Sequence, residues 1–305
     1  MALEKMLIFL RERNYGPFYC DEPLKNYTSW RVGGPADLLY CPQKIDECAH
    51  VLKMAHKWKV PLTILGEGSN VLISDQGIKG LVIITSGFQE ILWQGSRVTA
   101  GAGVLLASLS RQAAQRGFDG LAFAVGIPGS LGGAVVMNAG AYGSSLKEVL
   151  TEVQTLDKRG QLKTYKVEEL SLGYRQSIFK ETQELIVKVT LSLSWGDKTE
   201  IQTKMAAYLR ERRLKQPLEW PSAGSVFKNT AQGAGRLIEG VGAKGWSVGD
   251  AQVSEKHANF IINRGAAKAS DIRALIKEVQ LAVKEKYHLD LETEVVFYGF
   301  SDNGR

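Results

Sequence analysis

The sequence has few of the residues from which disulfide frameworks and zinc sites are built. Its 305 residues include three cysteines, Cys20, Cys41 and Cys48, an odd number without CxxC spacing. This pattern argues against a secreted disulfide framework and against a cysteine-based zinc site. The four histidines are scattered, and His50 and His56 lie six positions apart, which suits joint ligation from one helix poorly. We therefore predict no metal site.

Long apolar segments are also missing. No apolar run approaches the ~20 residues that a bilayer-spanning helix requires. The opening segment MALEKMLIFLRERN has the pattern of a short amphipathic helix, without the charged start, apolar centre and small-residue cleavage site of a signal peptide. We expect neither export nor membrane insertion, and hence a cytoplasmic location.

The two best-known nucleotide fingerprints are absent. The chain contains no GxxxxGK[ST], and no GxGxxG with an acidic residue at the required distance. The charge balance, 38 basic against 32 acidic residues, suits either nucleic acid or small anions. The densest basic run, RERRLK at 210–215, reads better as a solvated helix face than as a nucleic-acid patch. We expect no nucleic-acid partner and keep a basic nucleotide- or nucleic-acid-binding module as an alternative.

Glycine is the residue that the sequence concentrates. The stretch 126–143, GIPGSLGGAVVMNAGAYG, holds six glycines and one proline, so we predict a loop rather than an ordinary helix or central strand. Glycine lets backbone N–H groups approach a ligand, and Ser130 and Asn138 add hydrogen-bonding capacity. This composition suits a flat, phosphate-bearing cofactor. Taken alone, the stretch is explained equally well as a tight turn packed against a neighbouring element.

A second glycine-rich loop, LGEGSNV at 65–71, strengthens the cofactor interpretation. It follows the apolar run 61–65 and precedes Leu72 and Ile73, so it forms a turn between two strand-like segments. Two such loops, each after β-prone residues, indicate one shared anion site.

The remaining periodicity predicts about two domains with a boundary near 196–198. The segment 185–195 alternates strictly and is predicted to be a half-buried strand. Ser270 is predicted to be the N-cap of the last helix. Helices are expected at 45–58, from 100–104 to Gly117, and at 199–215, 235–241 and 270–286; strands are expected at 38–40, 61–65, 81–85, 97–100, 149–157, 162–165, 259–262 and 294–298.

Seven stretches in chain order resemble one enzyme family. They are NYTSWRVGGPAD, LGEGSNVLI, GIPGSLGGAVVMNAGAYG, LGYRQSIFK, PSAGSVFKN, SEKHANFIIN and LETEVVFYG. Together they resemble the UDP-N-acetylenolpyruvoylglucosamine reductases, flavoenzymes that make UDP-N-acetylmuramic acid for peptidoglycan. Because the stretches span Tyr27 to Gly299 in family order, the resemblance is more specific than any single glycine loop.

The resemblance implies an α+β fold. It consists of a PCMH- or vanillyl-alcohol-oxidase-type FAD-binding domain at 1–196, with two α/β subdomains at about 1–86 and 87–196, and an α+β substrate-binding domain at 197–305. FAD would be held without a covalent link. The implied flavin-binding residues are Gly66, Glu67, Gly68, Ser69, Asn70, Gly126, Ile127, Pro128, Gly129, Ser130, Gly132, Gly133, Asn138 and Ala139.

The resemblance also implies three catalytic residues. NADPH would reduce the flavin, and hydride would then pass to the terminal carbon of an enolpyruvyl ether. Arg175 would stabilise the negative charge that develops, Glu294 would lie beside the substrate carboxylate, and Ser225 would donate the proton. Tyr174, Lys228 and Asn229 would contact the sugar nucleotide. Taken singly, Arg175, Ser225 and Glu294 are better explained as an ion pair, a turn residue and an exposed carboxylate, and it is their joint position inside the family motifs that favours the catalytic interpretation.

The chain resembles the shorter form of this family. Leu185 follows Lys180 almost directly and Ser225 follows Arg175 by 50 residues, as in the form without the extra tyrosine-bearing loop. The expected partners are the UDP-sugar and NADPH, the expected state is a monomer, and the expected cellular role is in cell wall biogenesis, cell shape and cell division. Another FAD-dependent oxidoreductase of the same fold is the alternative within enzymes.

Overall fold

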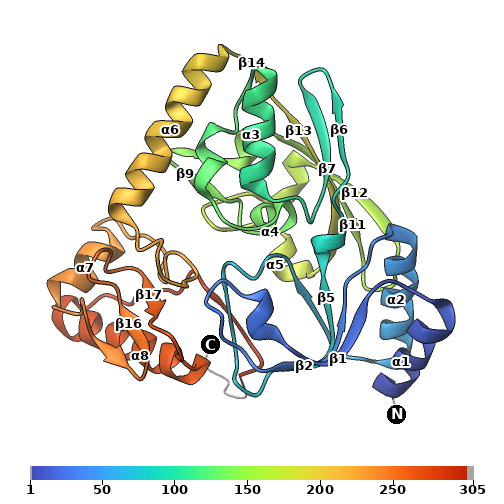
Figure 1. Ribbon diagram of the computed structural model, residues 1–305, viewed down its shortest axis with the longest axis horizontal. Coiled ribbons are helices and arrows are strands. Elements are labelled where there is room, and N and C mark those ends of the chain that lie inside the picture. The colour runs from blue at the N-terminus through green and yellow to red at the C-terminus, as the bar shows by residue number, and fades with distance from the viewer. Residues whose placement is uncertain (1, 301–305) are drawn as a thin grey trace. The chain divides into compact units, whose positions relative to one another are not determined.

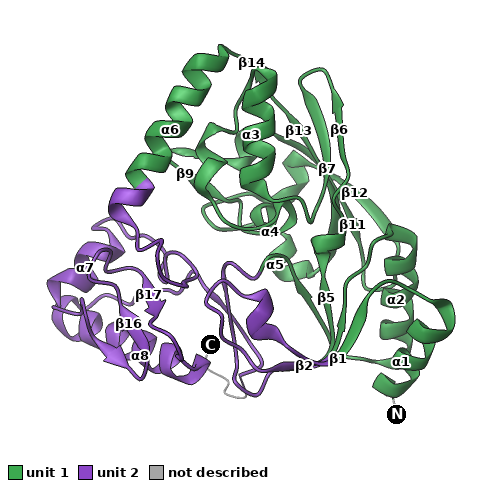
Figure 2. Ribbon diagram, in the orientation of Figure 1, with its two compact units in different colours: residues 1–20, 38–67, 80–211 green, residues 21–37, 68–79, 212–305 purple. Residues whose placement is uncertain are grey.

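The computed structural model describes residues 2–300, and these form two compact units. Unit 1 comprises the described residues up to Cys20, Leu38–Glu67 and Gly80–Glu211; unit 2 comprises Asp21–Asp37, Gly68–Lys79 and the described residues from Arg212 onward (Figure 2). Each unit therefore combines segments that are far apart in the sequence. The predicted division by ligand, FAD in 1–196 and substrate in 197–305, stays a prediction.

The elements agree with most of the expected ranges (Figure 1). The helices are α1 (Ala2–Arg13), α2 (Ile45–Trp58), α3 (Leu106–Arg116), α4 (Leu131–Val136), α5 (Phe179–Thr182), α6 (Lys198–Lys215), α7 (Ala234–Gly240) and α8 (Ala269–Tyr287). The strands are β1 (Phe18–Pro23), β2 (Pro35–Tyr40), β3 (Leu62–Leu65), β4 (Val71–Ile73), β5 (Ile78–Ile84), β6 (Ile91–Gln94), β7 (Arg97–Gly101), β8 (Phe118–Asp119), β9 (Gly140–Ala141), β10 (Ser144–Ser145), β11 (Leu150–Leu156), β12 (Leu162–Lys166), β13 (Leu185–Ser192), β14 (Ser194–Trp195), β15 (Ser247–Val248), β16 (Ala251–Val253), β17 (Ile261–Asn263) and β18 (Val296–Tyr298). Among the described residues, no helix is both long and apolar enough to cross a bilayer.

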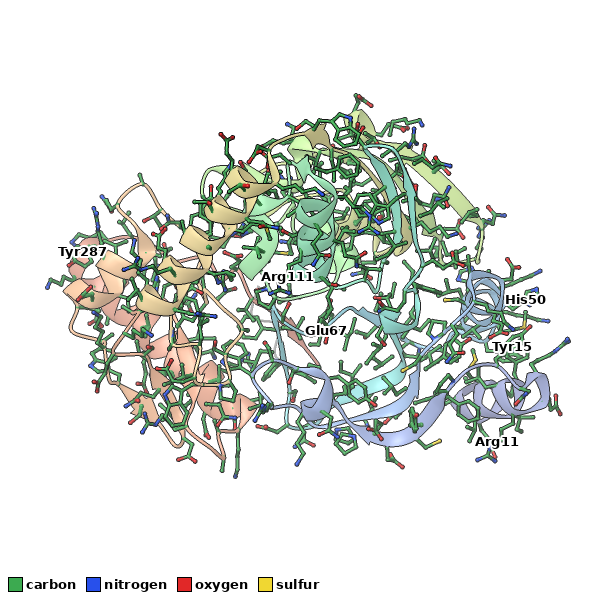
Figure 3. All side chains as sticks on the ribbon, turned by 45° about the horizontal axis from the view of Figure 1, so that its top comes forward. Arg11, Tyr15, His50, Glu67, Arg111 and Tyr287 are labelled. Carbon is green, nitrogen blue, oxygen red and sulfur yellow. The ribbon has the colours of Figure 1, made fainter. Side chains whose placement is uncertain are left out.

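The first sheet has the strand order β1-β2-β5-β3, and β3 pairs with β5 in parallel. Strands β1, β2 and β5 each begin in one unit and end in the other. In unit 1, Met6 and Leu10 of α1 pack with Val51 of α2 in one hydrophobic core. Tyr15 and His50 share a 2.8 Å hydrogen bond between the Tyr15 hydroxyl and His50 Nδ1, so the segment after α1 is joined to α2 (Figure 3).

The second sheet is antiparallel, with the order β12-β11-β13-β7-β6. Its central strand corrects one prediction, because β13 is buried on both faces rather than half-buried. Ile186 and Thr190, expected on the exposed face, are each 4% exposed. The reason is that β13 contributes to two cores: Leu185 and Val187 pack into the core that contains α1 and α2, whereas Ile186, Val189 and Leu191 pack into a separate core with α3 and α4.

The glycine-rich stretch 126–143 is not entirely a loop, which corrects a second prediction. Leu131–Val136 forms the short helix α4, and Ser130 is its N-cap, accepting a 3.3 Å hydrogen bond from the Gly133 N–H at Oγ. Leu131 and Val135 are fully buried. Burial of these apolar side chains and the serine cap outweigh the low helix propensity of the two glycines.

Unit 2 contains the sheet β15-β16-β17, the helices α7 and α8, and the parallel pair β4–β18. The buried stripe of α8 packs in the core of this unit together with Trp30 and Phe227. The predicted N-cap of α8 was wrong, since Ser270 lies inside the helix and Lys268 is at the cap position. Asp75 supplies the acceptors instead, at 2.8 Å from the Ala269 N–H and 2.9 Å from the Ser270 N–H.

Candidate functional site

The two glycine-rich loops meet inside unit 1. A Cβ atom added to Gly66 would lie 2.4 Å from Ser130 Oγ, so the end of β3 and the cap of α4 are in direct contact. No side chain larger than that of glycine fits at Gly66 without a shift. The two loops therefore lie together, as the sequence predicted. That they bind an anion stays a prediction.

A third segment, 101–105, completes this region. The Leu131 N–H donates to the Val104 carbonyl at 2.8 Å, and the Gly132 N–H donates to the Ala102 carbonyl at 2.9 Å. A Cβ atom on Gly132 would lie 2.9 Å from the Ala102 Cβ, so only glycine packs there without displacement. The N–H groups in the first turn of α4 are thus bonded within the protein, including that of Gly133, which donates to Ser130 Oγ.

Gly133 differs from Gly132 in being exposed. It is the one exposed residue of α4, and an added Cβ would meet Ser130 Oγ at 3.4 Å, an ordinary contact. Gly132 therefore serves packing, whereas Gly133 leaves exposed backbone without a side chain next to Ser130. A surface of this kind fits the flat, phosphate-bearing cofactor that the composition predicted.

The other predicted flavin-binding residues have varied environments. Glu67, labelled in Figure 3, is exposed, as is Pro128, whereas Asn138 and Ala139 are buried. Within the loop 65–71, Gly66 and Glu67 belong to unit 1 and Gly68, Ser69 and Asn70 belong to unit 2. Gly68 has a φ of +60°, and an added Cβ would lie 1.9 Å from the Tyr27 carbonyl oxygen, so the turn requires glycine.

Asn138 has a structural role that the sequence analysis missed. Its Nδ2 group donates to the Gly173 carbonyl at 2.9 Å, and its Oδ1 atom accepts from the Lys147 N–H at 3.0 Å. Its φ of +39° is unusual for a residue other than glycine, although asparagine tolerates it better than most. Asn138 therefore ties the glycine-rich stretch to the segment that bears Arg175.

Arg175 lies in a tight two-residue turn in unit 1. Gly173 and Gln176 each donate an N–H to the other's carbonyl, at 3.2 and 3.3 Å, so Tyr174 and Arg175 occupy the tip. Arg175 has a φ of +54°, a left-handed conformation that costs energy for a side chain with a Cβ. Its Nη2 group donates to the Gly140 carbonyl at 3.4 Å, and its guanidinium carbon lies 5.0 Å from the ring centroid of Tyr174.

Ser225 and Glu294 are brought together within unit 2. The Glu294 N–H donates to the Val226 carbonyl at 2.8 Å, and the Lys228 N–H donates to the Glu292 carbonyl at 2.9 Å. The segments 226–228 and 292–294 therefore run beside each other, bridged at Phe227 and Thr293. Both Ser225 and Glu294 are partly buried. Nothing in the local periodicity indicates this pairing, because it joins segments more than 60 residues apart.

Asn70 holds the backbone of Glu294 in the same unit. Its Nδ2 group donates to the Glu294 carbonyl at 3.0 Å, and its own carbonyl accepts from the Val296 N–H at 3.1 Å. The contact follows from the parallel pairing of β4 with β18, which places residues 70 and 294–296 side by side. The sequence assigned Asn70 to the flavin, and the structure adds a second role for its amide.

The predicted substrate residues make contacts within the protein. Lys228 Nζ forms an ion pair with Glu292 Oε1, and Asn229 Oδ1 accepts from the Ala234 N–H at 3.0 Å, at the start of α7. Tyr174 is 57% exposed at the tip of the arginine turn. These contacts explain where the side chains lie, and the assignment of the three residues to the substrate stays a prediction.

Two family models match the chain. Residues 36–166 match the FAD binding domain, and residues 216–298 match the C-terminal domain of UDP-N-acetylenolpyruvoylglucosamine reductase. The first match includes the two glycine-rich loops and the second includes Ser225 and Glu294. Arg175 lies between the two matched ranges.

Curated relatives are similar over nearly the full length. The UDP-N-acetylenolpyruvoylglucosamine reductase of Moorella thermoacetica is 46% identical over 280 residues, which is 92% of this chain and 92% of the relative. That of Caldanaerobacter subterraneus subsp. tengcongensis is 41% identical over 300 residues, 98% of each chain. The crystal structure of the enzyme from Thermus caldophilus has a TM-score of 0.80 at 36% identity, covering 93% of this chain and 98% of that one.

These findings confirm the predicted fold class, an α+β protein with an FAD-binding domain and a separate C-terminal domain. They confirm the resemblance that the seven sequence motifs indicated as well. The chain belongs to the UDP-N-acetylenolpyruvoylglucosamine reductase family and is an FAD-dependent oxidoreductase.

Proposed function

We propose that this protein uses NADPH and FAD to reduce the enolpyruvyl ether of UDP-N-acetylglucosamine to UDP-N-acetylmuramate, a precursor of peptidoglycan. The observation that supports this most directly is the backbone pairing of 226–228 with 292–294, which brings a serine and a glutamate together in unit 2. Both residues lie in the range that matches the C-terminal domain of the family. The proposed partners are the UDP-sugar and NADPH, and the proposed cellular role is in cell wall biogenesis.

The surface at Gly66, Ser130 and Gly133 is the proposed seat of the cofactor. Gly66 and Gly133 present backbone without a side chain next to the buried Ser130, which suits close approach of a planar, phosphate-bearing molecule. A flavin held there would supply the hydride that the terminal carbon of the enolpyruvyl group requires. The chain's own residues then have to stabilise the charge that develops on the adjacent carbon and its carboxylate, and deliver one proton to that carbon.

Arg175 is proposed to stabilise the developing negative charge. A guanidinium is always charged and can donate two parallel hydrogen bonds to a carboxylate. The two-residue turn limits the conformations of its backbone, and the hydrogen bond to the Gly140 carbonyl restricts its side chain. Because a pre-oriented donor needs little reorganisation as charge develops, this restriction favours catalysis.

Ser225 is proposed to donate the proton, and Glu294 to lie beside the substrate carboxylate. A serine hydroxyl is a weak acid, yet a substrate carbanion is a strong base, so transfer in this direction requires no histidine partner. Hydride on the terminal carbon and a proton on its neighbour together saturate the double bond. The serine alkoxide regains its proton from water or from a neighbouring acid after the product has formed.

An absorption experiment tests this proposal. The purified protein, loaded with FAD, should lose its yellow colour with NADPH under anaerobic conditions and regain it on addition of the enolpyruvyl sugar nucleotide. Ser225→Ala should bleach normally and regain colour at least ~100-fold more slowly, since general acid catalysis contributes about that much. Protein that recovers its colour only with oxygen would instead be a different oxidoreductase on the same fold.

A further inference from the structure

The segment that carries Ser225 is held on both sides. On one side it pairs with 292–294, as described above. On the other side lies Asn259, which is 5% exposed and precedes β17. Val226 and Phe227, the two residues after Ser225, are 0% and 2% exposed, so their backbone groups require partners inside the protein.

Asn259 supplies three of those partners. Its Oδ1 atom accepts from the Phe227 N–H at 2.9 Å, its Nδ2 group donates to the Phe227 carbonyl at 2.9 Å, and its backbone carbonyl accepts from the Val226 N–H at 2.9 Å. The side-chain amide thus bonds to both backbone groups of one residue, as the peptide of a neighbouring strand would. No other side chain of this size offers a donor and an acceptor in that fixed arrangement.

Asn259 is itself fixed by its surroundings. Its N–H donates to His257 Nδ1 at 3.3 Å, and His257 packs edge-on against Phe260 with ring centroids 4.8 Å apart. We call the three hydrogen bonds from Asn259 to Val226 and Phe227 the Asn259 clamp. The clamp fixes the backbone that follows Ser225 to the core of unit 2. Glu294, whose N–H donates to the Val226 carbonyl, is attached to the same backbone from the opposite side.

We propose that Asn259 is a positioning residue for Ser225. It acts through the backbone of Val226 and Phe227, and it sets where the Ser225 hydroxyl stands when a proton is delivered. The inference rests on the proposed function, in which Ser225 is the proton donor. Because the Ser225 proton is consumed only in reduction of the substrate, a displaced Ser225 hydroxyl should slow that step and not the reduction of the flavin.

The reaction offers a way to separate this role from general stability. Reduction of bound FAD by NADPH does not require the Ser225 proton, whereas reoxidation by the enolpyruvyl sugar nucleotide does. A variant that only weakens the fold would lower FAD content or slow both half-reactions. A variant that displaces Ser225 would slow the second half-reaction and leave the first unchanged.

Stopped-flow measurement of both half-reactions in Asn259→Ala makes the test. We expect NADPH to bleach the variant within about twofold of the wild-type rate, and reoxidation to slow by roughly 10- to 100-fold, the scale expected for a small misplacement of a reacting group. The solvent deuterium isotope effect on reoxidation should rise, because proton transfer becomes more rate-limiting.

Asn263→Ala is the matched control. Asn263 is 2% exposed in the same unit and also bonds to backbone through its side chain, at Trp30, Gly265 and Ala267. These partners lie outside the serine segment, so this variant should keep the wild-type ratio of the two rates. If Asn259→Ala does not fold, Asn259→Asp replaces it, since aspartate keeps the shape and the acceptor but loses the donor to Phe227.

A double variant provides the decisive comparison. If Asn259 acts through Ser225, then Ser225→Ala with Asn259→Ala should reoxidise no more slowly than Ser225→Ala alone. Independent, multiplying losses would overturn the proposal, and so would an Asn259 variant with wild-type reoxidation or with equal losses in both half-reactions. Failure of the wild-type protein to be reoxidised by the sugar nucleotide would instead overturn the proposed function.

Discussion

Three asparagine side chains bond to the backbone near the three catalytic candidates. Asn138 donates to Gly173 beside Arg175, Asn259 bonds to Phe227 beside Ser225, and Asn70 donates to the Glu294 carbonyl. Asparagine suits this task because its short side chain carries a donor and an acceptor with little rotamer freedom. Two of the three had been assigned to the flavin from the sequence.

Asn70→Ala distinguishes a role in binding FAD from a role in holding the backbone of Glu294. Loss of the 3.0 Å hydrogen bond to Glu294 should lower the stability of the protein by about 1 kcal/mol and slow reoxidation by the sugar nucleotide. If the Asn70 amide serves Glu294 rather than the flavin, the FAD dissociation constant of the apoprotein should change less than about twofold. Fluorescence titration with FAD measures it, and a large rise with normal reoxidation of the loaded enzyme would return Asn70 to the cofactor site.

His257 gives the clamp at Asn259 a dependence on pH. Burial lowers the pKa of the His257 imidazole below its usual value, with Lys244 adding to the effect and Glu239 opposing it. Because the unfolded chain then takes up a proton more readily than the folded protein, His257 should reduce stability as the pH falls below about 6.5. Protonation at Nδ1 would also remove the acceptor for the Asn259 N–H.

The pH effect can be measured against His257→Gln, which does not titrate. Between pH 7.5 and pH 5.5, the urea midpoint of the wild-type protein should fall further than that of the variant. An equal fall in both proteins would show that His257 does not contribute to the pH dependence of unfolding.

At the scale of elements, helix α4 gives different environments to Gly132 and Gly133, which the sequence analysis assigned the same role. Gly132→Ala places a methyl group 2.9 Å from the Ala102 Cβ, so we expect a loss of roughly 1–3 kcal/mol from overpacking. Gly133→Ala adds an exposed methyl group in ordinary contact and should stabilise the helix by up to about 1 kcal/mol. Denaturant midpoints of the two apoproteins measure this difference.

The same pair of variants examines the cofactor surface. If Gly133 faces the flavin, Gly133→Ala should weaken FAD binding while the apoprotein remains at least as stable as the wild type. Unchanged FAD affinity in that variant would place the cofactor away from α4. Gly132→Ala serves as the comparison, since its effect on FAD should follow from its effect on the fold.

At the scale of the whole molecule, the two units do not correspond to two successive parts of the chain. The loop 65–71 is continuous in sequence, yet it contributes to both units, and so do the strands β1, β2 and β5. Unit 2 needs residues 68–79 because β4 pairs with β18 and because Asp75 caps α8. A boundary placed by length and composition near residue 196 does not contain this information.

The sequence by itself determined the features that depend on neighbours along the chain. The bounds of α2, the hairpin of β11 and β12, and the apolar stripe of α8 follow from periodicity and local turns, and the family followed from motifs read in order. Only the tertiary structure decided the cap that Asp75 supplies, the burial of β13 on both faces, and the clamps at Asn70 and Asn259. The reason is that each of these depends on a partner brought near by folding, and a hydrogen bond or packing contact of that kind leaves no periodic trace in the sequence around either residue.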